Sequence, residues 1–122
     1  MSKEYYELHA SMCGVFASPR RLEIIHLLGD KELTVSEILS SISITKTNLS
    51  QHLAIMKDRG IVKTRRQGQH IYYSIANKKI IKVCELMSDV LNESLDRRHL
   101  TITGRTDGGM EKRSALRRVS DE

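Results

Sequence analysis

The stretch TKTNLSQHLAIMKDRGIVKTRRQGQHIYYSIA, residues 45–76, decides the fold because a segment with helical periodicity runs into two short strand-like segments across a glycine. Leu49, Leu53 and Met56 recur at the spacing of one apolar helix face. Gly60 follows them and can end the helix, since glycine adopts the left-handed conformation without strain. The first half of the stretch therefore predicts an amphipathic helix.

The second half of the stretch predicts a β-hairpin. Ile61–Val62 and Ile71–Tyr73 are β-branched or aromatic runs, and the polar, basic segment Arg65–His70 lies between them as a turn. A helix followed by a cationic hairpin is the order of a winged helix-turn-helix, in which the hairpin forms a two-stranded β wing. The predicted fold class is therefore mainly α (α+β).

The helix face opposite the apolar stripe is polar, which suits a helix that reads base edges in a DNA groove. A cationic wing beside it can bind phosphates, so that the wing positions the protein while the helix supplies specificity. A protein-docking surface would need aromatic or aliphatic anchors at these places, so a winged-helix protein-interaction module is the weaker alternative. The predicted contacts with double-stranded operator DNA are Lys46, Thr47, Asn48, Ser50, Gln51 and His52 on the helix and Arg65, Arg66 and Gln69 on the wing.

Capping signals and apolar spacing place the other helices. Glu37 lies three residues after Thr34, the spacing of a capping box. The predicted helices are 4–16, 19–29 after Ser18, a short helix after Thr34, the DNA-reading helix after Thr45, and 78–96 after Asn77.

Composition bounds the class of protein. At 122 residues the chain fits one domain, placed at 1–96, and a net charge of +5 favours a polyanionic partner. No membrane span or signal peptide is evident, which predicts a cytoplasmic protein without a membrane partner. The lack of a catalytic triad, paired carboxylates or a phosphate loop argues against an enzyme. Residues 97–122 predict a flexible basic tail, with a DNA-binding arm at Arg113, Arg117 and Arg118 as the alternative.

Residues of about 17–95 resemble the ArsR/SmtB family of dimeric bacterial and archaeal repressors. The stretches that carry the resemblance are SPRRLEIIHLL at 18–28, LTVSEILSSI at 33–42, ITKTNLSQHLAIMKDRGIV at 44–62 and RRQGQHIYYSI at 65–75. The most specific features are the S-Q-H-L sequence of Ser50 to Leu53 and the R-x-G-x-x-x-Y-Y pattern of the wing. The resemblance implies a repressor whose affinity for its operator is switched by an inducer.

The resemblance also implies a homodimer formed through the first and last helices. Those helices carry more apolar surface than a thin winged domain covers alone. The alternative is that both helices only cover the core of a single chain. A twofold dimer would present two reading helices to successive major grooves. The apolar positions are Tyr5, Leu8, Met12 and Phe16 in the first helix and Ile80, Val83, Cys84, Met87, Val90, Leu91 and Leu95 in the last.

Departures from the family bear on the inducer. Thr34 occupies a position where many relatives have a thiolate metal ligand, and Asn77, Lys78 and Lys79 stand where others begin a zinc-like site. Lysines there would repel a cation, so both common metal sites are expected to be absent. No cofactor is predicted on this basis.

The two cysteines, Cys13 and Cys84, fall on the first and last helices. A thiol-based redox or reactive-sulfur signal that joins them would change the dimer, and this is the predicted switch. Sulfur-sensing relatives place their first cysteine on the second helix, where this chain has His26. The alternatives are a thiolate-bound metal, metalloid or iron-sulfur cluster, and two packing residues without a sensor role.

Overall fold

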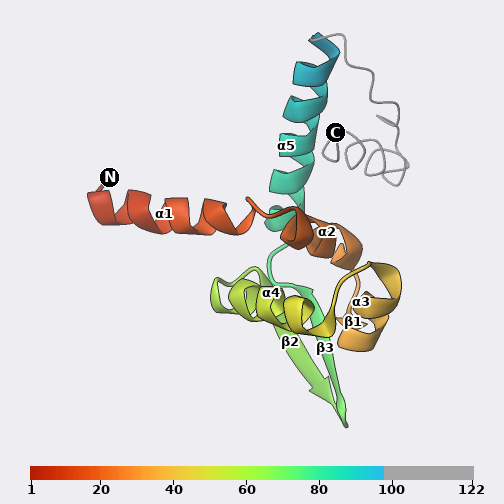
Figure 1. The fold of residues 1–122 in the computed structure, drawn as a ribbon. Coiled ribbons are helices and arrows are strands. Elements are labelled where there is room, and N and C mark those ends of the chain that lie inside the picture. Colours follow the sequence, from red (N-terminus) through yellow and green to blue (C-terminus); the bar gives the residue numbers. More distant parts are fainter. Residues whose placement is uncertain (98–122) are drawn as a thin grey trace. The chain divides into compact units, whose positions relative to one another are not determined.

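The computed structural model describes residues 1–97 (Figure 1). The chain divides into two compact units, Met1–Lys82 and Val83–Glu122. The elements in chain order are α1 (Lys3–Val15), α2 (Pro19–Leu28), β1 (Leu33–Thr34), α3 (Val35–Ser41), α4 (Lys46–Asp58), β2 (Val62–Gln67), β3 (His70–Ile75) and α5 (Lys79–Arg97). The fold is the predicted winged helix-turn-helix, mainly α with a β wing.

Helices α2, α3 and α4 begin where the capping signals predicted. Ser18 caps α2 by accepting a hydrogen bond from the backbone N–H of Arg21, and Thr45 caps α4 in the same way through Asn48. Thr34 and Glu37 form the predicted capping box at the start of α3. At the other end of α4, Gly60 has φ +75°, the left-handed conformation that lets the chain leave the helix and enter the wing.

The core of the first unit lies between α2, α3, α4 and the sheet. The predicted stripe of α4 is confirmed, because Leu49, Leu53 and Met56 are at most 2% exposed. They share the core with other fully buried side chains, Ile24, Leu28, Ile38 and Ile61. Burial of this stripe fixes which face of α4 remains outside.

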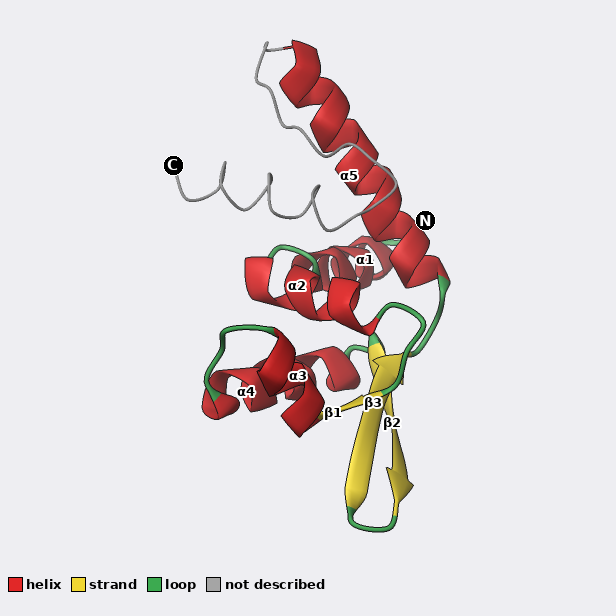
Figure 2. Cartoon of the chain, turned by 90° about the vertical axis from the view of Figure 1, so that its right-hand side faces the viewer, coloured by secondary structure: helices red, strands yellow, loops and turns green. Residues whose placement is uncertain are grey.

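The wing is longer than the sequence suggested. Strands β2 and β3 pair antiparallel from Val62 with Ile75 to Gln67 with His70, so the turn consists of residues 68 and 69 alone (Figure 2). Gly68 has φ +63°, which a two-residue hairpin turn favours. The prediction that Arg65–His70 forms the turn was therefore wrong, and Arg65 and Arg66 are strand residues. The outer wing is exposed on both faces, so no core imposes the apolar alternation that would have marked a strand.

The sheet also has a third strand that the sequence analysis did not predict. β1 pairs antiparallel with β3, Leu33 with Tyr73 and Thr34 with Tyr72, which gives the order β1-β3-β2. A strand of two residues is too short to show a period of two. The wing hairpin is thereby joined to the residues that start α3, and β2 is left as an edge strand.

Helices α1 and α5 expose much of their apolar surface. On α1, Tyr5, Leu8 and Met12 are 42–73% exposed. Between residues 83 and 97, α5 buries Leu95, one of the apolar positions named from the sequence, and Asn92, which was not among them, and it half-buries Cys84. The exposed apolar side chains of α5 are Val83, Leu86, Met87, Val90 and Leu91.

Among the helices of residues 1–97, none combines the length and the apolar character that crossing a membrane requires. The tail predicted at 97–122 lies outside the described residues, apart from Arg97 at the end of α5.

Candidate nucleic-acid interface

The outer face of α4 is polar and forms a shallow, open hollow on the surface. It is lined by Lys46, Thr47, Ser50, Gln51 and Ala54, which follow one another at helical spacing. Ala54 adds little bulk, and the other four residues offer one cation, two hydroxyls and one amide. Such groups can donate to and accept from base edges. Asn48 is exposed but lies beside this hollow rather than in it.

His52 is turned away from that face. It is half-buried, and its Nδ1 lies 3.4 Å from Nη1 of Arg21. Arg21 in turn donates to the carbonyl oxygens of Val15, at 2.8 Å, and Gly14, at 3.4 Å, at the end of α1. Its position favours a structural role, and the prediction that His52 contacts DNA remains a prediction. Burial, followed by the nearby Arg21 and Arg20 charges, lowers the pKa of His52.

Stability is expected to fall as the pH drops below about 6.5, the ordinary pKa of histidine. Because folding lowers the pKa of His52, the unfolded chain binds its proton at a higher pH than the folded one, and the proton then favours unfolding. His52→Gln should flatten this part of the profile while leaving stability at pH 8 nearly unchanged. Urea unfolding of the wild type and of His52→Gln between pH 5 and 8 measures how the free energy of unfolding depends on pH. An equally steep profile in the variant would assign the effect to other groups.

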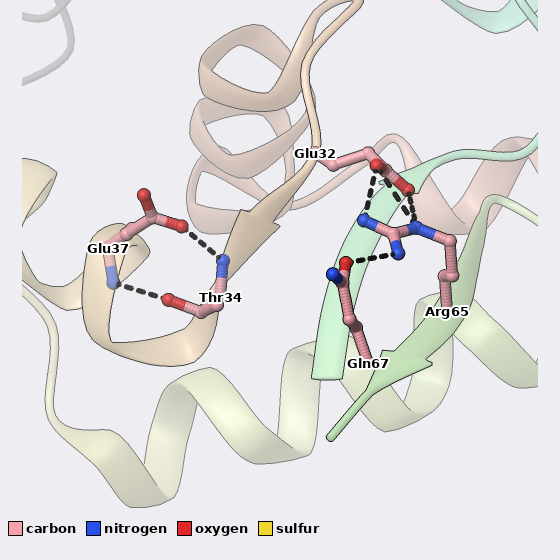
Figure 3. A network of polar contacts seen from close by, with 5 residues as sticks. All are labelled: Glu32, Thr34, Glu37, Arg65 and Gln67. Atoms are coloured by element: carbon pink, nitrogen blue, oxygen red, sulfur yellow. Dashed lines mark hydrogen bonds and ion pairs between the residues drawn. The ribbon is translucent and has the colours of Figure 1, made fainter. Parts of the chain in front are cut away.

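The two neighbouring arginines of the wing, Arg65 and Arg66, differ in how far the protein itself engages their guanidinium groups. Arg66 is exposed and, among residues 1–97, donates only to the carbonyl oxygen of Gly68 within its own hairpin, at 3.3 Å. Arg65, by contrast, is held by the carboxylate of Glu32, at distances down to 2.9 Å, and by Gln67 (Figure 3). The hydrogen bond from Arg65 lowers the pKa of Glu32. The sequence analysis did not identify Glu32, since nothing in a spacing of 33 residues signals such a pair.

Residues 18–64 match the family of bacterial regulatory proteins described as the arsR family. The chain is also 33% identical over 109 residues to the HTH-type transcriptional regulator Rv0081 of Mycobacterium tuberculosis, covering 88% of this chain and 96% of that protein. This chain belongs to the ArsR family. It is therefore a transcriptional regulator and not an enzyme, as predicted.

Other comparisons agree with the ArsR assignment. The crystal structure of Rv0081 superposes with a TM-score of 0.74 at 34% identity and covers 80% of this chain and 98% of that chain. The homodimeric winged helix-turn-helix domain of Mb0332 from Mycobacterium bovis gives a TM-score of 0.70 at 30% identity, with 78% and 91% covered. The nodulation protein NolR of Rhizobium meliloti is 31% identical over 90 residues, 74% of each chain.

The thiols of this ArsR-family chain differ from each other. Cys13 on α1 is exposed, whereas Cys84 on α5 is half-buried. Burial, with a smaller effect of the Glu85 charge, raises the pKa of the Cys84 thiol and so disfavours its thiolate at neutral pH. Within residues 1–97, no group of three or more His, Cys, Asp or Glu side chains is arranged to hold a metal ion.

Proposed function

We propose that this ArsR-family regulator is a cytoplasmic, homodimeric repressor that binds double-stranded operator DNA and is released by a thiol-directed signal through Cys13 and Cys84. The observation that carries the DNA-binding part is the set of exposed polar side chains on the outer face of α4, Lys46, Thr47, Ser50 and Gln51, beside a wing that carries an exposed cation at Arg66. Apart from Ile55, the exposed side of α4 holds no large apolar group, which disfavours a protein-docking role. The proposed contacts are Lys46, Thr47, Asn48, Ser50, Gln51, Arg66 and Gln69.

Homodimer formation is supported by the exposed apolar side chains of α1 and α5. Val83, Met87 and Val90 are each more than half exposed and recur at the spacing of one helix face. Contact between water and such an apolar face is unfavourable. A second copy of the chain that covered the face would remove it from water and so stabilise the dimer. Mb0332, with a similar fold, is described as homodimeric.

Repression, rather than activation, is the direction proposed. Relatives of this chain carry both descriptions, since PagR of Bacillus anthracis is a transcriptional repressor and HlyU of Vibrio cholerae a transcriptional activator. A compact reading unit that covers a major groove blocks access to overlapping promoter DNA without needing a surface for polymerase. A reporter gene behind the operator, with and without the regulator, distinguishes the two directions.

The switch is proposed at the cysteines because Cys13 lies among the residues that connect α1 with α4. The Arg59 guanidinium, at the end of α4, donates to the hydroxyl and carbonyl oxygens of Ser11. Arg21 links the carbonyl oxygens of Gly14 and Val15 to His52 of α4. Both contacts flank Cys13, so a reaction that shifts this part of α1 would act on the reading helix from two points.

The proposed chemistry starts at the accessible thiol. A peroxide oxidises Cys13 to a sulfenic acid with the release of water. The Cys84 thiolate then attacks that sulfur, and hydroxide leaves as a second water when the disulfide forms. A persulfide donor would transfer one sulfur atom to Cys13 and leave as its thiol. A second donor molecule, reduced to a thiol and hydrogen sulfide, would accept the two electrons released when that added sulfur bonds to the Cys84 sulfur as a trisulfide. Cysteine-ligated metal or metalloid sensing is the alternative, and arsenite and zinc are the probes for it.

Gln51→Ala and Arg66→Ala are expected to weaken DNA binding in different ways. Gln51 lies in the hollow, so its loss should erode discrimination by about 1 to 3 kcal/mol at one base pair and leave the salt dependence unchanged. Loss of Arg66 should weaken binding to all duplexes alike and reduce the salt slope by about one. Fluorescence anisotropy with operator and scrambled DNA at several salt concentrations measures both. Lys57→Ala, near the end of α4, is the control.

If both variants bind like the wild type at every salt concentration, α4 and the wing are not the DNA interface. A wild-type protein that binds no duplex from a randomised library would refute the proposed function as a whole.

A further inference from the structure

Arg65, which the sequence analysis predicted to contact DNA, has each of its guanidinium nitrogens engaged within the protein (Figure 3). Its Nε donates to both carboxylate oxygens of Glu32, at 3.2 and 3.0 Å, and its Nη2 donates to Oε1 of Glu32 at 2.9 Å. Its Nη1 donates to Oε1 of Gln67 at 2.8 Å. The guanidinium carbon lies 4.7 Å from the centre of the Tyr72 ring.

The partners of Arg65 join the wing to the helix-turn-helix. Arg65 pairs with Tyr72 across β2 and β3, and Tyr72 pairs on its other side with Thr34 of β1. Glu32 comes just before β1, and Arg65 lies in β2. The ion pair therefore spans the sheet from β2 at one edge to the start of β1 at the other. Thr34 is also the N-cap of α3, held in place by its reciprocal hydrogen bonds with Glu37, at 2.9 and 3.2 Å. The ion pair of the wing and the capping box of α3 are thus linked through the backbone pairing of β1 with β3.

The geometry of this pair distinguishes it from an ordinary surface ion pair. Exposed pairs usually contribute little, because two flexible side chains must be ordered and water screens the charges. Here the guanidinium meets the carboxylate with two nitrogens, has a further acceptor and lies over a ring, an arrangement that makes arginine directional. A guanidinium held in this way has to give up several partners before it can bind a phosphate.

We propose that Glu32 and Arg65 are positioning residues that hold the wing at a set angle to α3 and α4, and that Arg65 does not itself bind phosphate. The inference rests on the proposed DNA-binding function. The phosphate contact of the wing is then left to Arg66, the neighbouring strand residue, whose guanidinium has only the Gly68 carbonyl as a partner in the described residues.

Glu32→Gln tests the inference, because the two possible roles of Arg65 predict changes of opposite sign. If Glu32 positions the wing, the variant should bind operator DNA roughly fivefold more weakly, the ratio for an exposed ion pair at the upper end of its range, with an unchanged salt slope. If Glu32 merely withholds Arg65 from phosphate, the variant should bind more tightly. Asp30→Asn, which removes a charge from the same loop, is the control for the general effect of charge.

Two more variants distinguish a positioning role of Arg65 from a direct contact between Arg65 and phosphate. Arg65→Gln should reproduce the loss seen in Glu32→Gln without lowering the salt slope. The exchanged pair, Glu32→Arg with Arg65→Glu, keeps the net charge and should recover most of the affinity. A salt slope reduced by about one in Arg65→Gln, or no recovery in the exchanged pair, would overturn the inference.

Hydrogen exchange on the protein without DNA makes the test independent of the proposed function. Amides of residues 62–75 should exchange faster in Glu32→Gln than in the wild type, and those of the Asp30→Asn control should not. Unchanged exchange in Glu32→Gln overturns the inference even if DNA binding is confirmed. Should the wild type bind no DNA at all, the proposed function fails while the exchange experiment still decides whether the pair holds the wing.

Discussion

Val90→Lys is expected to convert the protein into a monomer and to weaken operator binding by about 10²- to 10⁴-fold. Val90 is 56% exposed in the centre of the apolar face of α5, between Met87 and Leu91. In the proposed dimer a lysine there would be buried in the apolar interface, and twofold symmetry would bring a second one into it, so two charges would have to be desolvated. Two linked reading helices bind two half-sites together, and the loss of that linkage removes the gain of bivalent binding.

Sedimentation equilibrium and anisotropy with an intact and a half operator measure this effect. Glu85→Lys places the same side chain on the same helix at an exposed position away from the apolar face, and should remain dimeric. A Val90→Lys protein that sediments as a dimer would remove α5 from the interface. A monomer with full operator affinity would instead show that dimerisation is not needed for binding.

Cys13→Ser and Cys84→Ser are each expected to abolish release from the operator by a peroxide or a persulfide donor. The wild type should lose about 5- to 150-fold in affinity on treatment, the usual range for coupling between two sites. One substitution suffices because a bridge needs both sulfurs. Anisotropy before and after treatment measures the release, and arsenite and zinc are added in parallel to test ligation.

Two controls belong to that experiment. Met12→Leu removes an exposed methionine beside Cys13 and should respond like the wild type, which excludes oxidation of Met12 as the cause. Peptide-level mass analysis after a short pulse should find modification at Cys13 before Cys84, whose pKa burial raises. If both serine variants are released as readily as the wild type, the cysteines are packing residues.

The elements that depend on neighbouring residues in the chain could be predicted from the sequence. The α4 stripe, the caps at Ser18 and Thr45 and the left-handed Gly60 are consequences of spacing within about one or two helical turns. The turn of the wing could not be predicted in the same way, because exposed strands such as β2 carry no apolar alternation.

The side-chain contacts that orient the arginines and the histidine of the candidate site join residues far apart in the sequence. No local sequence pattern indicates such contacts. Arg65 and Glu32 are 33 residues apart, and Arg21 and His52 are 31 apart. The sequence identifies both residues as cations, but only the folded chain shows which carboxylate or imidazole each one contacts. The polar face of α4 was predicted as a set, whereas the inward turn of His52 depends on the end of α1 lying close by.

The sheet order has a consequence for the behaviour of the protein at high concentration. β2 is an edge strand, and its backbone groups on the outer side offer a template on which the strand of another molecule could pair. Lys63 and Arg66 are exposed along that edge, whereas Arg65 is paired with Glu32. Charges in such a row resist strand-by-strand aggregation, because a second copy would bring its own cations against them. The basic wing thus protects the regulator from self-association through its sheet during the time it spends away from DNA.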